Sequence, residues 1–367
     1  MKIIERFWKK DPVLCISFIL AALSMILVPP DRTYMEYIDY PVLIILACLM
    51  IVVSGFKMAG VFAGLSCTLT RRCRSLRGLS IILVSLCFFI AMLVTNDVAL
   101  LTFVPFTLEL LRIEDVNRKI FIIVMETVAA NLGSMMTPIG NPQNLFLFSY
   151  YNMGLGDFSA AVVPIGIASY IIILAAMAFV KNKQLSISWQ ESGEKLRVKE
   201  LVVFSILFVI CILTVLKVVD SRVCLVVVVV FTLLTAPKLL KEVDYGLLVT
   251  FICFFIFVGN IGSLENVRVQ VARQLLGREL LASALICQGI SNVPSAIMLS
   301  GFTDNAQALL RGVNIGGLGT LVASLASLIS FKLYNKSEGS KPARYIIYFT
   351  GINIILLIVL LVLASIL

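Results

Sequence analysis

An aspartate lies inside a long apolar run of the chain. The run AMLVTNDVALLTFVPFTLELL covers residues 91–111, and Asp97 follows Thr95 and Asn96 within it. Ionisable side chains at membrane depth are costly and are usually functional. One interpretation is that Asp97 binds a cation or carries a proton. The other is that Asp97 or Asn96 caps the helix that follows, and the two roles are compatible.

A second polar cluster interrupts the apolar segment 280–302. Its sequence QGISNVPSA places Ser291 and Asn292 just before Pro294, as in a helix that begins with a capping residue and a first-turn proline. This cluster has no carboxylate, so the two clusters are chemically unequal. Because a carboxylate attracts a cation strongly in a low-dielectric site, we expect the first cluster to bind a coupling ion more tightly.

Residues 131–145, NLGSMMTPIGNPQNL, combine helix breakers with polar side chains. Gly133, Pro138, Gly140 and Pro142 oppose a continuous helix. Unwound carbonyls and side-chain oxygens suit a hard cation such as sodium, while the N-termini of half-helices offer N–H groups to an anion. These residues and the two clusters contain no lysine or arginine, which favours a small or weakly charged substrate.

The composition predicts the environment of these polar residues. Of the 367 residues, 60% are hydrophobic and 14% are charged, whereas soluble domains carry about 25% charged residues. The apolar residues fall in blocks near the roughly 20 residues that span a bilayer. We therefore expect an all-α polytopic membrane protein in a bacterial cytoplasmic (inner) membrane. The net charge of +9 then records basic cytoplasmic loops and not a nucleic-acid partner.

Several kinds of chemistry are excluded or disfavoured by composition. The chain contains no histidine, which excludes a His-ligated zinc or haem site and His-based catalysis. Its nine cysteines form no CxxC pair and are interpreted as small buried hydrophobes. No HExxH motif and no credible nucleophile–base pair occurs, so an intramembrane enzyme is disfavoured. We expect no cofactor, with Na+ or H+ as the coupling ion.

The distribution of basic residues predicts the topology. The N-terminus carries Lys2, Arg6, Lys9 and Lys10, which places it inside by the positive-inside rule. Segment 78–111 is basic at both ends, so we expect a re-entrant hairpin with its tip at the first polar cluster. Segment 280–302 is interpreted as a second hairpin that enters from outside. The prediction is about nine full spans plus two hairpins, with the C-terminus outside.

Two stretches are too charged to span a membrane, LTRRCRSLRG (69–78) and LENVRVQVARQLLGREL (264–280). The second has apolar residues at helical spacing, as in a helix that lies in the membrane interface. The chain then divides into N-terminal spans with a first interfacial segment, a first half with a hairpin, a broken helix and a span, a cytoplasmic linker, further spans with an interfacial helix, and a second half with a hairpin, a broken helix and the C-terminal span: 1–77, 78–180, 181–199, 200–279 and 280–367.

The two halves share a short internal similarity. NLGSMMTPIGNPQNL (131–145) aligns with NIGGLGTLVASLASL (314–328) at an offset of 183 residues, with identities at Asn131/Asn314, Gly133/Gly316, Thr137/Thr320 and Leu145/Leu328. Each half also has a span, an amphipathic piece, a hairpin and an interrupted helix in the same order. Opposite entry sides of the hairpins predict inverted-topology repeats, a transporter design with its site at the midplane.

Four motifs in this order resemble the ion transporter superfamily, in its citrate-transporter-like group. They are TNDVALL (95–101), NLGSMMTPIGNPQN (131–144), ISNVPSAIML (290–299) and NIGGLGT (314–320). The likeness covers nearly the whole chain and is nearest to uncharacterised bacterial inner-membrane anion transporters. Sodium-coupled di- and tricarboxylate carriers, arsenite permeases and sodium/proton antiporters are related.

The resemblance implies a homodimer in which a transport domain moves like an elevator against a scaffold. Thr95, Asn96 and Asp97 stand where carboxylate carriers have the Ser-Asn-Thr motif that binds sodium and substrate, and Ser291 and Asn292 stand at the second such motif. The implied substrate residues are Thr95, Asn96, Gly133, Ser134, Asn141, Asn144, Ser291, Asn292, Gly317, Thr320 and Ser324. A candidate sodium site comprises Asn96, Asp97, Thr137 and Gly140, and a weaker second site comprises Asn292 and Ser327.

The sequence therefore favours a secondary active transporter of a small inorganic or organic anion or oxyanion, coupled to sodium or protons. The main alternative is a cation (sodium)/proton antiporter that uses Asp97. A passive channel is a further alternative, because channels also place polar residues at membrane depth.

Overall fold

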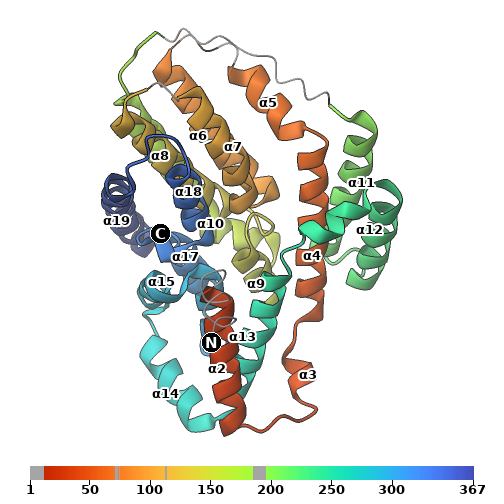
Figure 1. The fold of residues 1–367 in the computed structure, drawn as a ribbon. Coiled ribbons are helices and arrows are strands. Elements are labelled where there is room, and N and C mark those ends of the chain that lie inside the picture. The colour runs from red at the N-terminus through yellow and green to blue at the C-terminus, as the bar shows by residue number, and fades with distance from the viewer. Residues whose placement is uncertain (1–11, 71–72, 74, 112–113, 185–195) are drawn as a thin grey trace, which may run out of the picture.

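The computed structural model describes residues 12–70, 73, 75–111, 114–184 and 196–367, and these residues are almost entirely helical (Figure 1). Six of their helices are long and apolar enough to cross a membrane by length and composition, namely α4, α6, α10, α11, α13 and α19. The expectation of an all-α polytopic membrane protein is confirmed. The basic N-terminus, most of the arginines of 69–78, Arg112 and the middle of the linker 181–199 lie outside the described residues.

One group of helices packs around α4 and α13, on the right and at the bottom of Figure 1. Its members are α2 (Pro12–Leu27), α3 (Tyr34–Tyr37), α4 (Tyr40–Met58), α5 (Val61–Thr70), α11 (Val198–Val215), α12 (Ser221–Thr235), the 3₁₀ helix η1 (Pro237–Glu242), α13 (Tyr245–Ser263) and α14 (Glu265–Leu275). Helix α4 packs against α11 and α12, and α13 packs against α2. The apolar run 40–63 is not one helix, because Gly60 adopts a φ of 79° between α4 and α5.

The remaining helices come from two separate parts of the chain. The first part comprises α6 (Leu76–Val94), α7 (Asn96–Leu110), α8 (Val116–Ser134), α9 (Pro142–Tyr150) and α10 (Leu155–Ala178). The second comprises α15 (Glu279–Ile290), α16 (Asn292–Ser300), α17 (Ala306–Ile315), the 3₁₀ helix η2 (Leu321–Ala323), α18 (Leu325–Asn335) and α19 (Pro342–Ile366). Helices α8 and α9 are separated by a non-helical stretch at 135–141, as the helix breakers predict.

Single residues join two of these helix pairs. Thr95 connects α6 to α7 with a φ of 97°, and Ser291 connects α15 to α16 with a φ of 76°. Positive φ is uncommon for residues other than glycine and is unfavourable for a β-branched side chain. In each pair the two helices pack against each other, so the polar clusters at 95–97 and 291–292 lie at tight helix junctions.

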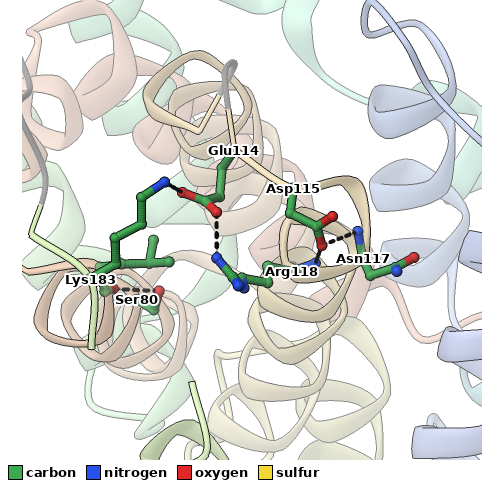
Figure 2. A network of polar contacts seen from close by, with 7 residues as sticks. Ser80, Glu114, Asp115, Asn117, Arg118 and Lys183 are labelled. Carbon is green, nitrogen blue, oxygen red and sulfur yellow. Dashed lines mark hydrogen bonds and ion pairs between the residues drawn. The ribbon is translucent and has the colours of Figure 1, made fainter. Parts of the chain in front are cut away.

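The outer ends of the first pair meet at one end of the molecule, where Figure 2 shows their polar contacts. The N–H of Leu76, at the start of α6, donates to the carbonyl of Lys183 at 2.8 Å. The ammonium of Lys183 lies 3.3 Å from Oε2 of Glu114, which follows α7, and Oε1 of Glu114 accepts from Arg118 at 2.7 Å. The start of α6 and the end of α7 are therefore close together.

The outer ends of the second pair also meet, near the end of α9. The hydroxyl of Thr303, which follows α16, is 3.4 Å from Oε1 of Glu279 at the start of α15. The hydroxyl of Tyr151 donates to the carbonyl of Thr303 at 2.7 Å. Because α8 and α9 lead from Glu114 to Tyr151, the two helix pairs have their outer ends at opposite ends of the α8–α9 segment.

Candidate functional site

Asn131, near the end of α8, is the centre of a buried amide network. Its Oδ1 accepts from Nδ2 of Asn96 and from the hydroxyl of Ser324, both at 3.0 Å. Its Nδ2 donates to the hydroxyl of Ser327 at 3.3 Å. One side chain thus connects the α6–α7 junction to the polar stretch before α18. A buried amide with all of these bonds made is both stabilising and orientationally specific.

Asn314, near the end of α17, makes the corresponding contacts toward the first half. Its Oδ1 accepts from Nδ2 of Asn141 at 3.1 Å, and its Nδ2 donates to Oδ1 of Asn144 at 2.6 Å. Asn141 also caps α9, since its Oδ1 accepts from the N–H of Asn144 at 2.9 Å, and Pro142 follows as the first helical residue. Asn141 and Pro142 thus begin α9 as a capping residue and a first-turn proline, whereas Ser291, where a cap was expected, makes no side-chain capping bond to α16.

The contacts of the two asparagines are reciprocal. Adding 183 to a residue of the first half gives its partner in the second, so that Asn131 with Ser327 corresponds to Asn314 with Asn144. The bonds Ser324 to Asn131 and Asn141 to Asn314 form a second reciprocal pair. A self-complementary set of contacts of this kind is what an approximate two-fold axis produces.

Two threonines fasten the non-helical stretches to the helix junctions. The hydroxyl of Thr137 donates to the carbonyl of Met92 at 2.5 Å, and that of Thr320 donates to the carbonyl of Gln288 at 2.9 Å. Met92 lies three residues before Thr95, and Gln288 lies three residues before Ser291. Each threonine therefore attaches its non-helical stretch to the helix about one turn before the junction residue.

Glycines permit the close packing of these parts. A Cβ atom on Gly133 would lie 2.1 Å from the carbonyl oxygen of Phe88 in α6, and one on Gly316 would lie 2.7 Å from Cα of Ala284 in α15. A Cβ on Gly140 would lie 2.1 Å from the carbonyl oxygen of Ser134. Only glycine lets the backbones approach this closely.

A cavity of about 690 Å³ opens beside the first junction. Thr95, Asp97 and Asn141 line it from the first half, and α4, η1 and α13 line it from the other side. Oδ1 of Asp97 is buried and makes no hydrogen bond among the described residues. A buried carboxylate oxygen without a donor is costly unless a cation or a proton satisfies it.

Charged side chains of the α4–α13 group also line this cavity. They are Lys57, Lys238, Glu242 and Asp244. Asp244 is near enough to Asp97 to repel it electrostatically. The cationic groups absent from the junctions thus face the cavity from α4 and η1.

A second cavity, of about 400 Å³, lies at the C-terminal ends of α9 and α13 and beside the residue that precedes α4. Its lining includes Tyr37, Asp39, Tyr150, Arg268 and Ser300. Burial raises the pKa of Asp39, and this rise is partly offset by the N–H of Val42 and the charge of Lys217.

Three phenylalanines lie between the two cavities. Phe146 of α9 packs against Phe251 and Phe255 of α13, with ring centroids 6.4 and 5.6 Å away. Leu145 lines the first cavity and Phe146 the second, and along α13 Leu247 lines the first and Phe255 the second. Buried aromatic rings at these separations form a closely packed apolar layer.

The residues expected to bind substrate or ion divide into two sets. Thr95, Asp97 and Asn141 line the first cavity. Most of the others belong to the buried network or contact it, namely Asn96, Gly133, Ser134, Thr137, Gly140, Asn144, Thr320, Ser324 and Ser327. The last three, Ser291, Asn292 and Gly317, lie around the second junction. No hydrogen bond between described residues joins Asp97 directly to Thr137 or Gly140, the other parts of the candidate sodium site.

Gln288 is a site residue that the sequence reasoning missed. Its Nε2 donates to the carbonyls of Gly316 and Leu318, both at 3.0 Å, and its Oε1 accepts from the N–H of Thr320 at 2.8 Å. It therefore clamps the stretch between α17 and η2. The signal available was a glutamine inside an apolar segment one turn before a polar junction.

Comparisons with known proteins agree with this architecture. The chain is 31% identical over 310 residues to the inner membrane protein YbiR of Escherichia coli, covering 83% of this chain and 82% of that one. It is 34% identical over 294 residues to an uncharacterised transporter of Methanocaldococcus jannaschii, covering 78% and 79%. A shorter match, 32% identical over 176 residues, joins 47% of this chain to 34% of a silicon efflux transporter of Oryza sativa.

These features define a multi-pass membrane transporter, not an enzyme. A family model described as citrate transporter (CitMHS) matches residues 3–313, and the chain belongs to this family. The resemblance inferred from the four motifs is confirmed. The expected location in an inner membrane is consistent with that of YbiR.

Proposed function

We propose that the chain is a secondary active transporter of a small anion or oxyanion, driven by sodium ions or protons. The unsatisfied carboxyl oxygen of Asp97 at a polar cavity carries this proposal. A cation or proton at Asp97 removes the charge that would repel an anion in the same cavity. The family description names citrate and one relative is a silicon transporter, which supports oxygen-rich solutes as the substrate class.

The donors near the first junction support a small substrate. Asn141 and Thr95 offer neutral polar groups, and the cations Lys57 and Lys238 stand across the cavity. We propose that the substrate sits between them. The candidate residues around the second junction, such as Ser291 and Asn292, then hold this junction and the polar stretch before α18 in place.

We propose that the two halves are inverted repeats, each with a re-entrant hairpin. The reciprocal contacts of Asn131 and Asn314 support an approximate two-fold relation. The meeting of the outer ends of α6 and α7 beside Lys183, and of α15 and α16 beside Thr303, supports hairpins that enter from opposite faces. The proposed topology retains about nine full spans, with the N-terminus inside and the C-terminus outside.

The proposed motion is an elevator. The transport domain comprises residues 78–180 and 280–367, and the scaffold comprises residues 1–77 and 200–279. Two copies of the chain form a homodimer. The position of the first cavity between α7 and the α4–α13 group supports this division, because the cavity lies where the two would slide. The linker 181–199 would join the halves on the cytoplasmic side.

A ligand-stabilisation experiment tests the proposal. Purified wild-type protein and an Asp97→Asn variant are melted with citrate, succinate, phosphate, sulfate or silicate, in sodium or choline buffer and at two pH values. We expect at least one solute to raise the melting temperature of the wild type, more strongly with sodium or at low pH, and this ion dependence to disappear in the variant. No stabilisation by any solute, with stabilisation by sodium alone, would favour the antiporter.

The antiporter remains the second candidate because Asp97 and Asp244 bring two acidic groups to one cavity. In everted vesicles, an antiporter collapses a proton gradient when sodium is added without any anion substrate. A sodium-coupled anion symporter leaves the proton gradient unchanged when sodium is added, and a proton-coupled one dissipates it only when its anion substrate is present, with or without sodium. Concentrative uptake against a gradient separates either carrier from a channel.

A further inference from the structure

Glu126 of α8 is a buried carboxyl group that the proposed transport cycle does not use. Its side chain has no exposed surface, and it lies away from both cavities. Oε1 accepts a hydrogen bond from the hydroxyl of Thr107 in α7. Oε2 is buried and has no hydrogen-bond partner among the described residues.

The groups around Glu126 include no cation in the described part of the chain. Cys87 of α6 and Tyr345 of α19 are the titratable groups that interact with it electrostatically. The hydroxyl of Tyr345 lies 3.0 Å from the hydroxyl of Ser330 in α18, and the hydroxyl of Thr127 donates to Ser330 at 2.7 Å.

The basic residues of α8 itself lie at its other end. Arg118 and Lys119 are about two turns before Glu126. Arg118 is bonded to Glu114, and Lys119 also interacts with Glu114. Helices α10 and α17 also pack on α8. The hydroxyl of Tyr170 in α10 is bonded to that of Ser85, and Arg311 in α17 donates to the carbonyl of Ala161. None of these charges reaches the unpaired oxygen.

An ionised carboxylate in this position would cost several kcal/mol, because one hydroxyl donor does not replace water and the described residues supply no counter-charge. A neutral carboxyl avoids most of that cost. We propose that Glu126 holds a bound proton while α7 and α8 are packed together, and releases it when they separate. This makes Glu126 a proton-binding site distinct from Asp97, whose cavity is open to ions and water.

Any effect of this proton on transport rests on the proposed function, but the binding of a proton at Glu126 does not. The hydroxyl of Thr107 joins α7 to α8 through Glu126. An ionised Glu126 accepts this bond more strongly, but its charge lacks water, so deprotonation would favour separation of α7 from α8. The position of α7 would then respond to pH independently of what is bound at Asp97. Proton binding can be measured whether or not any substrate is known.

Infrared spectroscopy of the purified protein tests the inference without a transport assay. A protonated carboxyl has a carbonyl stretch that shifts on H/D exchange and that an ionised carboxylate lacks. We expect such a band at neutral pH in the wild type and in Asp97→Asn, and its loss in Glu126→Gln. Glu109→Gln, which alters an acid of α7, should retain it. A spectrum without a Glu126-dependent band at neutral pH would overturn the proposal.

A second measurement covers the case in which Glu126→Gln does not fold. Dicyclohexylcarbodiimide, an apolar reagent that reacts with protonated carboxyls, is applied to the wild type in membranes, and peptides are read by mass spectrometry. Labelling of Glu126 that falls as the pH rises is expected. Labelling of Glu126 at neutral pH that is no greater than labelling of the exposed Glu109 would contradict a bound proton. Failure of the transporter proposal would leave either readout unchanged.

Discussion

Asp97 and Glu126 each have a carboxyl oxygen that is buried without a hydrogen bond, yet their surroundings differ. Asp97 lines a cavity with polar and charged walls, whereas Glu126 is enclosed by α6, α7 and α19. We therefore propose that an ion from solution binds at the first group and a proton at the second. In these proposals the same side-chain chemistry takes two different roles, decided by access to water and not by residue type.

Asp97→Asn should abolish ion coupling and leave the protein folded. Asparagine keeps a side-chain oxygen at the start of α7 but removes the charge, so transport by the variant should no longer depend on the concentration of sodium or protons. Asp244→Asn is the matched control, because it lines the same cavity and asparagine can still cap α13 at the N–H of Leu247. Transport measured against sodium and against pH distinguishes them. Normal ion-driven transport by Asp97→Asn would reduce that residue to a helix cap.

At the scale of elements, the two helix junctions depend on close backbone contacts that the neighbouring helices make. Gly133 of α8 lies against α6, and Gly316, which ends α17, lies against α15. Each contact is one or two turns from a junction with positive φ. The helices can therefore be placed correctly only if small residues occur at both points.

Gly133→Ala should destabilise the protein by about 1–3 kcal/mol or more, because the new methyl group would overlap the backbone of Phe88. Gly156→Ala in α10 is the control, since nothing lies within 4 Å of a Cβ at that position. The melting temperatures of the two variants in the same detergent provide the measurement. Equal stability of both would show that α6 and α8 can move apart without cost.

The loop before α8 should become sensitive to acid through Glu114. Burial alone would raise the pKa of Glu114, but a backbone hydrogen bond from Asp115 and the contacts with Lys183 and Arg118 hold it below 4.5. The folded state therefore gains stability from Glu114 above its ordinary pKa and loses it as the pH falls through the lowered value.

The corresponding measurement is a pH series of melting curves for the wild type and Glu114→Gln. The variant should melt lower at pH 7, by about 1 °C or a little more for a partly exposed ion pair. The gap should close as the pH falls through the lowered pKa of Glu114, because the wild-type carboxyl then also becomes neutral. A gap that does not change with pH would mean that the contacts seen in Figure 2 add no charge-dependent stability.

For the whole molecule, we expect access to the first cavity from one side at a time, because a phenylalanine layer lies between the two cavities. In the proposed topology the first cavity opens to the cytoplasm and the second to the outside. Both cavities are walled by α4 or its N-terminal flank, α9 and α13. A substrate at Asp97 would therefore meet the layer formed by Phe146, Phe251 and Phe255 before it could reach the other side.

Ser54→Cys and Ser300→Cys test this on a cysteine-free background, because Ser54 lines the first cavity and Ser300 the second. A membrane-impermeant thiol reagent should label Ser54→Cys only from the cytoplasmic face and Ser300→Cys only from outside. Adding Phe146→Ala should allow some labelling of Ser54→Cys from outside. Labelling of both positions from one face in the starting protein would refute the arrangement.

Parts of the fold and of the site could be predicted because their causes act locally. The helix breakers of 131–145 interrupt the helix where expected, since α8 ends at Ser134 and α9 begins at Pro142. The break that Gly60 makes after α4, inside the apolar run 40–63, was not predicted, because its positive φ is a property of the folded backbone. Gln288 was missed because its role depends on three backbone groups that lie about 30 residues farther along the chain.

The sequence by itself determined that this is a multi-pass membrane protein with polar interruptions, since apolar length, helix breakers and charge act over about 20 residues. Only the tertiary structure decided what those interruptions contact. The bond between Asn131 and Ser327 joins residues 196 apart, and that between Asn144 and Asn314 joins residues 170 apart. Lys57 and Lys238 reach the cavity of Asp97, and Glu126 loses contact with water, only because separate helices pack there. Such contacts depend on how the packed helices enclose or expose each side chain, which local patterns do not encode.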